Sequence, residues 1–169
     1  MATITYYGNS WEVPWPTNPD NMIDGDIETF AEQEFQGEMQ SIDGNTCDGS
    51  NLGTITKVEL RFHGKMEETG EGAPRLVLQP WFGAPPPGDE YSELLTTSPA
   101  WSSWFDITND SQAPSPWAWE DVRDMFILVI PWDIDVGVAY CSKIEIRVTY
   151  TTGEAKGAMQ TGKYWGEPI

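Results

Sequence analysis

The sequence is poor in the residues that build common metal and catalytic sites. It contains one histidine, His63, and two cysteines, with no Cys-x-x-Cys pair. An ordinary zinc site needs more Cys and His ligands than this, so that class of site is excluded. The chain has no nucleophile elbow, phosphate-binding loop or dinucleotide fingerprint, and His63 has no Ser or Cys motif near it in the sequence. We therefore expect a protein that is not an enzyme.

Basic residues are also scarce. The chain has 9 Lys and Arg against 27 Asp and Glu, a formal net charge of -18. A surface this acidic repels DNA, RNA and anionic lipid, so we expect no nucleic-acid partner. No stretch approaches the ~18 apolar residues of a membrane-spanning helix, so we expect no membrane insertion. The charge favours solubility, cation binding or a salty medium.

The start of the chain shows no secretory signal, because the residues after Met1 form neither a basic segment nor an apolar run. A Met followed by Ala favours synthesis in the cytoplasm and release by another route, such as lysis of a cell that produces virus particles. We expect the protein in a virion or on an extracellular surface.

Length and composition predict one globular domain followed by an arm. The chain has 169 residues, of which 39% are hydrophobic and 12% aromatic, enough to fold without a metal or a disulfide. We place the domain at residues 1–152 and a C-terminal arm at 153–169, which has no periodicity. Tyr164 and Trp165 favour docking of this arm on a neighbour, because exposed aromatic side chains in a free tail are costly. Simple fraying of the tail is the alternative.

Short strands separated by Gly and Pro dominate the rest of the pattern. Residues 56–63 and 143–150 alternate between apolar and polar, which predicts antiparallel strands with one face in water. Residues 75–79 and 125–130 are apolar on both faces and predict buried central strands. Further strands are expected at 4–7 and 104–107.

One short helix is expected, with Ser115 as its N-cap, Pro116 at its first position and residues 117–122 following. Many short strands with a single helix predict an all-β fold. We expect an antiparallel β-sandwich of the jelly-roll type, with one short helix and an extended C-terminal arm.

Two segments resemble known modules. Residues 21–30, Asn-Met-Ile-Asp-Gly-Asp-Ile-Glu-Thr-Phe, resemble the early motif of discoidin-like, galactose-binding-like jelly rolls, with Phe30 where that group often has Trp. Residues 117–125 and 142–150 are similar to the close of β-sandwich modules of phage particles and microbial surface proteins. There a Trp-rich short helix precedes a buried strand, and an alternating strand ends in Val-x-Tyr.

A calcium site is the first chemistry this pattern suggests. Asp24, Asp26 and Thr29 lie within six residues around a glycine, and such a turn can direct oxygen ligands at a hard cation. In the discoidin-like group the matching positions hold a structural calcium, completed by a Glu on the last strand. The resemblance therefore implies Glu145 as the fourth ligand. The alternative is an ordinary turn in which Asp24 caps local N–H groups.

Sugar binding is the second activity that the sequence suggests. Carbohydrate modules stack aromatic rings on sugars, and the loop-placed tryptophans are the candidates: Trp11, Trp15, Trp101 and Trp132. The alternative is that tryptophans have a structural role in the core. We expect the four in strand or helix contexts to lie in the core or to cover a sheet: Trp81, Trp104, Trp117 and Trp119.

The two cysteines leave two possibilities open. A disulfide between Cys47 and Cys141 would join a polar loop to the C-terminal strand, and two unpaired thiols are the alternative.

These features together predict a non-enzymatic structural or adhesive surface module. We favour a virion protein, such as a capsid decoration or tail-associated protein, or a component of another extracellular assembly. Its partners would be assembly neighbours in a homo-oligomer, virion or filament. The main alternative is a discoidin-like carbohydrate-binding module with a structural calcium, and the third is a glycan-active enzyme or lyase on the same scaffold.

Overall fold

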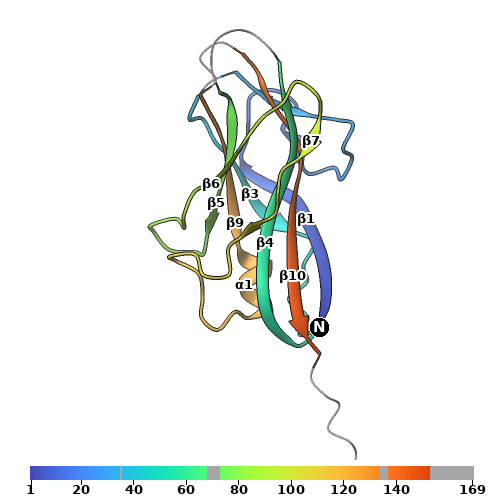
Figure 1. Ribbon diagram of the computed structural model, residues 1–169, viewed down its shortest axis with the longest axis vertical. Coiled ribbons are helices and arrows are strands. Elements are labelled where there is room, and N and C mark those ends of the chain that lie inside the picture. Colours follow the sequence, from blue (N-terminus) through green and yellow to red (C-terminus); the bar gives the residue numbers. More distant parts are fainter. Residues whose placement is uncertain (35, 68–72, 134–136, 153–169) are drawn as a thin grey trace, which may run out of the picture.

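Antiparallel strands make up about half of the structure, a computed structural model that describes residues 1–34, 36–67, 73–133 and 137–152 (Figure 1). The strands are β1 (Ala2–Val13), β2 (Ala31–Gln33), β3 (Gln40–Asn45), β4 (Thr54–Met66), β5 (Arg75–Trp81), β6 (Tyr91–Leu94), β7 (Ala100–Trp101), β8 (Phe105–Asp106), β9 (Phe126–Trp132) and β10 (Ala139–Thr151). A 3-10 helix, η1 (Pro19–Met22), and one α-helix, α1 (Trp119–Asp124), complete the described elements.

The strands follow one hydrogen-bonded path, β6-β5-β9-β3-β1-β10-β4-β7, with β2 added on β10 and β8 on β4. Strand β1 belongs to both layers of the sandwich, because residues 2–7 pair with β10 and residues 8–13 pair with β3. The path therefore folds at β1 into two layers. We call them the β10–β4 sheet, with β2, β7 and β8, and the β5–β9 sheet, with β3 and β6.

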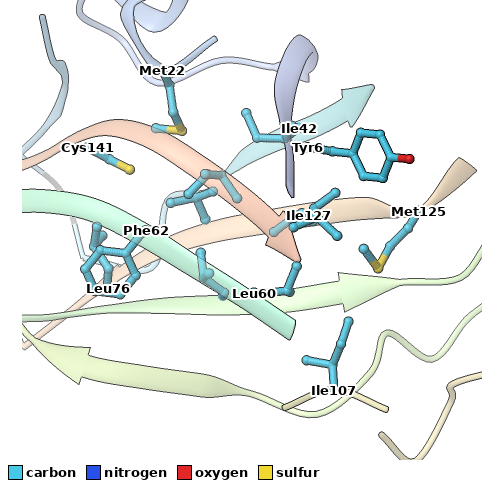
Figure 2. Close-up of a cluster of buried hydrophobic side chains, with 14 of the residues drawn as sticks. Tyr6, Met22, Ile42, Leu60, Phe62, Leu76, Ile107, Met125, Ile127 and Cys141 are labelled. Atoms are coloured by element: carbon cyan, nitrogen blue, oxygen red, sulfur yellow. The ribbon is translucent and has the colours of Figure 1, made fainter. Parts of the chain in front are cut away.

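The space between the layers is filled by apolar side chains (Figure 2). The alternation seen in the sequence gives the inward faces of β4 and β10, where six apolar residues are buried: Val58, Leu60, Phe62, Ile144, Ile146 and Val148. The β5–β9 sheet contributes Leu76, Leu78, Ile127 and Val129 from the other side. Each such burial contributes about 1.5–3 kcal/mol, which is why the alternating pattern decides the fold. The predicted all-β sandwich is confirmed.

The predicted helix begins later than expected, and the predicted cap at Ser115 and Pro116 is wrong. The helix starts at Trp119, and the extended residue before it donates its N–H to Asp121 Oδ2 at 2.7 Å. Trp117 is held outside the helix, since its indole Nε1 donates to the Thr108 carbonyl at 3.0 Å and its ring packs edge-on against Phe82. These tertiary contacts override the local Ser-Pro signal.

Candidate functional site

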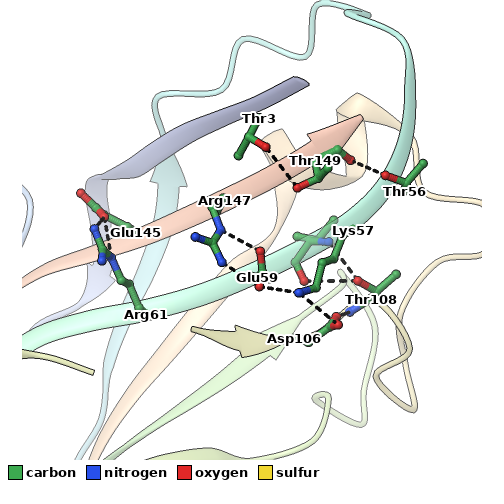
Figure 3. Close-up of polar contacts among 11 residues, drawn as sticks. Thr3, Thr56, Lys57, Glu59, Arg61, Asp106, Thr108, Glu145, Arg147 and Thr149 are labelled. Atoms are coloured by element: carbon green, nitrogen blue, oxygen red, sulfur yellow. Dashed lines mark hydrogen bonds and ion pairs between the residues drawn. The ribbon is translucent and has the colours of Figure 1, made fainter. Parts of the chain in front are cut away.

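The outer face of the β10–β4 sheet is a ladder of charged side chains (Figure 3). Side chains alternate along a strand, so every second residue of β4 and β10 points away from the core. Five of the chain's nine lysines and arginines lie at these positions: Lys57, Arg61, Lys65, Lys143 and Arg147. The scarce basic residues of an acidic protein are therefore gathered on one face of two paired strands.

Glu59 is the most enclosed carboxylate of this ladder, with a side chain only 5% exposed. Arg147 donates from Nε and Nη2 to its two oxygens at 2.7 and 2.8 Å, and Lys57 Nζ lies 2.7 Å from Oε1. The Arg147 hydrogen bonds hold the pKa of Glu59 below its usual range. A buried carboxylate can stay ionised when it accepts three charge-assisted hydrogen bonds. The Glu59–Arg147 pair therefore joins β10 to β4.

Glu145, the predicted fourth calcium ligand, lies in the next row of the same ladder. Arg61 donates to its Oε2 from Nε at 2.8 Å and from Nη2 at 2.6 Å, and Lys143 Nζ lies 3.7 Å from Oε1. Two cations contact this carboxylate, so in the structure it acts as an ion-pair partner, and its role as a calcium ligand stays a prediction.

The other three predicted ligands do come together in one turn. Asp24 accepts the N–H of Asp26 at Oδ1 and the hydroxyl of Thr29 at Oδ2, both at 2.7 Å, and Asp26 Oδ1 accepts the N–H of Glu28 at 2.9 Å. These are the self-contained bonds of a capped turn. Over the described residues, no group of three or more His, Cys, Asp or Glu is arranged to hold a metal. Calcium binding at this turn stays a prediction.

Two tryptophans lie over the arginines of the ladder. The Arg61 guanidinium carbon is 4.0 Å from the ring centre of Trp101 and 4.2 Å from that of Trp104, and Arg147 is 4.1 Å from Trp104. Cation–π contacts of this kind contribute about 0.5–2 kcal/mol each. Trp101, a predicted sugar platform, thus has one ring face taken by Arg61, and both rings cover the sheet.

His63 has a partner that no sequence motif indicated. Its Nδ1 lies 2.7 Å from the hydroxyl of Ser142 on the neighbouring strand, and burial lowers the pKa of this imidazole. Its ring lies between Phe30 and Trp101, with centroid distances of 6.1 and 5.0 Å. Ser142 has no exposed surface and His63 only 6%, so a substrate cannot approach the hydroxyl. The pair stabilises the sheet.

The remaining predicted sugar-binding tryptophans differ in exposure. Trp15 is a core residue, 1% exposed, and its assignment to a sugar-stacking surface is wrong because its ring packs in the interior cluster. Trp11 is half-buried, and its Nε1 donates to Asp20 Oδ1 at 2.9 Å. Trp132 is 46% exposed at the end of β9. Of the four candidates, Trp132 alone presents a large exposed ring.

Both cysteines are free thiols and buried in the structure. The second possibility, two unpaired thiols, therefore holds there, and Cys47 and Cys141 form no disulfide. Cys47 follows β3, and burial raises the pKa of its thiol. Cys141 lies inside β10, where burial raises its thiol pKa to about 12. The predicted arm contacts of Tyr164 and Trp165 lie outside the described residues.

The outer face of the β5–β9 sheet is quite different from the charged ladder. Strands β5 and β9 pair so that their outward residues form four rows: Arg75 with Trp132, Val77 with Ile130, Gln79 with Leu128, and Trp81 with Phe126. Among these eight positions, only Arg75 is charged. Val77 and Leu128 are each 5% exposed, yet neither belongs to the interior cluster. They form the centre of a second apolar layer on the outside of the sandwich.

The edges of this layer are open to solvent. Leu94 on β6, opposite Arg75, is 57% exposed, and Met39 just before β3 is 40% exposed. Arg75 lies between Leu94 and Trp132, where its Nη2 is 3.3 Å from Asp133 Oδ2 and its Nε is shut off from solvent. We define the apolar outer face by its members: Val77, Trp81, Leu94, Phe126, Leu128, Ile130 and Trp132.

The sequence indicated part of the apolar outer face. Residues 75–79 and 125–130 were apolar on both faces, which predicted central strands, and β5 and β9 do have a strand on each side. The pattern does not say what covers the second face. Leu94 was missed because a single Leu in a short polar strand carries no periodicity, and only the β5–β6 register places it opposite Arg75, on whose other side Trp132 lies.

Comparisons of the chain with protein-family models, with curated proteins and with solved structures gave no match. The similarity to discoidin-like and phage-particle modules therefore remains a resemblance of short motifs. In the part of the chain that is described, no helix is long and apolar enough to cross a membrane.

Proposed function

We propose that this chain is a non-enzymatic structural module of a surface assembly, which docks on a protein neighbour through its apolar outer face. The contrast between the two outer faces carries this proposal. A sandwich in water normally has polar residues on the outside of both sheets. Here the β10–β4 sheet follows that rule, whereas the β5–β9 sheet presents Trp132 and Leu94, 46% and 57% exposed, around an apolar centre.

The mechanism is burial of apolar area at a fixed interface. Removing apolar surface from water is worth about 25 cal/mol per Å², and contiguous exposed apolar patches commonly mark interaction sites. The acidic groups outside this face stay in solvent, where a net charge of -18 opposes non-specific aggregation. The ion pairs on the opposite sheet join β10 to β4, and we expect docking to need little reorganisation of the sandwich.

The setting we propose is a virion, as a capsid decoration or tail-associated protein, or another extracellular assembly. The support for this setting is the resemblance of the closing motif to modules of phage particles, together with a surface suited to a permanent neighbour.

Density-gradient fractionation of the native assembly tests the function. The wild-type chain is expected to travel with particles in fixed stoichiometry, and Leu94→Glu is expected to remain at the top of the gradient. Leu52→Glu is the matched control, because Leu52 is 38% exposed in the loop before β4 and lies off the face. Comigration of Leu94→Glu with the particles would contradict the proposed docking face.

A carbohydrate-binding module is the second candidate, favoured by one observation. Trp132 is exposed, and Arg75 and Asp133 lie beside it, an aromatic ring flanked by polar groups as in sugar sites. Binding to a glycan array tests this function: Trp132→Ala should abolish a real signal, and Trp11→Ala should leave it intact.

A further inference from the structure

The apolar outer face matches a second copy of itself. We infer that two copies of this chain pack β5–β9 sheet against β5–β9 sheet, related by a two-fold axis that runs parallel to the strands between β5 and β9. This inference rests on the proposed function and names the neighbour. Sheets that pack face to face keep their strands within about 30° of each other and lie about 10 Å apart, so the arrangement is an ordinary one.

The register of the two strands makes the face self-complementary. The two-fold axis places β5 of one copy over β9 of the other at the same level. Val77 then lies over Ile130 of the second copy, and Trp81 lies over Phe126 of the second copy, because these residues are cross-strand partners within one chain. Apolar rows meet apolar rows in both directions, as an isologous contact requires.

The charged residue of the face also finds a partner in this arrangement. Arg75 and Trp132 are cross-strand neighbours, and Asp133 follows directly. The same two-fold axis therefore places Arg75 over Trp132 and Asp133 of the second copy, and the reverse pair forms at the same time. A guanidinium against an indole ring and a carboxylate is a favourable contact that occurs twice per dimer.

The charge distribution favours a second copy as the occupant. Two chains of net charge -18 repel each other wherever their acidic residues meet. Among the outward residues of the described strands β3, β5, β6 and β9, the charged ones are Arg75 and Asp43, which follows the Ile42–Ile127 pair and so lies beside Phe126 at the margin; Asp133 comes directly after β9. It is therefore a surface on which two such acidic chains can approach closely, since screening limits repulsion beyond about 8 Å at physiological salt.

The size of the face sets the strength of the contact. Four strands spaced about 4.8 Å apart and up to seven residues long cover ~400 Å² in projection. A stable interface buries about 800 Å² per partner, so this contact alone gives a weak dimer. Its apparent affinity rises when an assembly holds many copies close together, because the effective concentration is then high.

Sedimentation of the purified full chain over a wide concentration range tests the inference. The wild type is expected to dimerise reversibly, and moderate salt is expected to strengthen the dimer by screening the acidic repulsion. Leu94→Glu should weaken it at least about tenfold, and the matched Leu52→Glu should not. Loss of association on adding salt would overturn an apolar interface.

Charge exchange tests the predicted register. In the proposed dimer, Arg75→Glu places the new carboxylate of one copy against Asp133 of the second copy. Asp133→Arg places the new guanidinium against Arg75 of the second copy, so each variant alone should dimerise less. An equimolar mixture of the two should recover the association, because each contact then joins opposite charges. Both side chains are more than one third exposed, so neither substitution places a charge in the core and both variants are expected to fold. Absence of recovery in the mixture, with both variants folded by circular dichroism, overturns this register.

The two proposals fail separately. If the wild type stays monomeric at every concentration, the inference that the partner is a second copy is wrong. If it still travels with particles and Leu94→Glu does not, the neighbour is a different protein and the proposed function stands. If neither variant nor wild type is found with particles, the proposed function fails.

Discussion

Arg147 and Glu59 form a two-bond ion pair across the β10–β4 register, with N···O distances of 2.7 and 2.8 Å. The carboxylate is almost fully covered, and Trp104 lies over the guanidinium. Removing one member of such a pair leaves the other charge covered and unpaired, which costs more than the pair itself contributes. The charged ladder is therefore a structural device, distinct from the face that we propose for docking.

We expect Glu59→Gln to lower the free energy of unfolding by about 2 kcal/mol at neutral pH, because the negative charge and one of the two acceptor oxygens that Arg147 and Lys57 contact are lost. The pKa of Glu59 is lowered in the folded state, mainly by the Arg147 hydrogen bonds. Its contribution is therefore complete above the unfolded-state pKa of about 4.3 and is lost as the pH falls through the lower folded value. Urea unfolding at a series of pH values measures this.

The control is Glu120→Gln, since Glu120 is exposed on α1, and it should change stability by less than about 0.5 kcal/mol. A stability gap between the wild type and Glu59→Gln that stays constant as the solution is acidified would contradict the assignment of the pKa shift.

Gly53 and Gly83 should respond differently to alanine. A Cβ at Gly53 meets the carbonyl of Thr151, and its φ of +142° is one that side chains rarely adopt. Gly83 has a φ of +86° but open space around it. We expect Gly53→Ala to cost about 3 kcal/mol and Gly83→Ala about 1 kcal/mol, measured by thermal unfolding. Equal losses would show that the Gly53–Thr151 contact does not exist.

The thiols of Cys47 and Cys141 should not react with a thiol reagent in the native protein. Burial raises the pKa of both, that of Cys141 to about 12, so little thiolate is present and no reagent reaches it. Titration with a thiol reagent should find almost none in the native chain and two per chain after unfolding without reductant. Finding none after unfolding would reveal a Cys47–Cys141 disulfide.

Calcium can be tested through Glu145. Its contacts with Arg61 and Lys143 predict that Glu145→Gln lowers the melting temperature by the same amount with and without calcium. Asp24→Asn is the companion variant, because Asp24 holds the turn around Gly25. A calcium-dependent melting temperature that disappears in Glu145→Gln would contradict the ion-pair role.

The fold was accessible from the sequence because burial of one face imposes a period of two. Val58 to Phe62 and Ile144 to Val148 show that period, and both segments became strands with a buried face. The helix start was not accessible, since Trp117 is held by Thr108 and Phe82, which lie nine and thirty-five positions away in the chain.

The candidate site was only partly accessible for a related reason. The sequence identified Trp132, yet it treated Trp15 as equivalent, although one is exposed and the other buried. Which side of a sheet faces a second layer depends on register, and a one-residue change in register would exchange the faces. The pairing of Leu94 with Arg75, and of Arg75 with Trp132, is a property of the assembled sheet.

Protection of Trp132 from hydroxyl-radical oxidation is the most direct test of the docking face. The particle-associated chain and a dilute isolated chain are oxidised in parallel, and modified peptides are quantified by mass spectrometry. Tyr7, 36% exposed on the outside of the other sheet, serves as the internal control. We expect oxidation of Trp132 to fall several-fold in the assembly and oxidation of Tyr7 to stay unchanged. Equal oxidation of Trp132 in both samples would contradict this expectation.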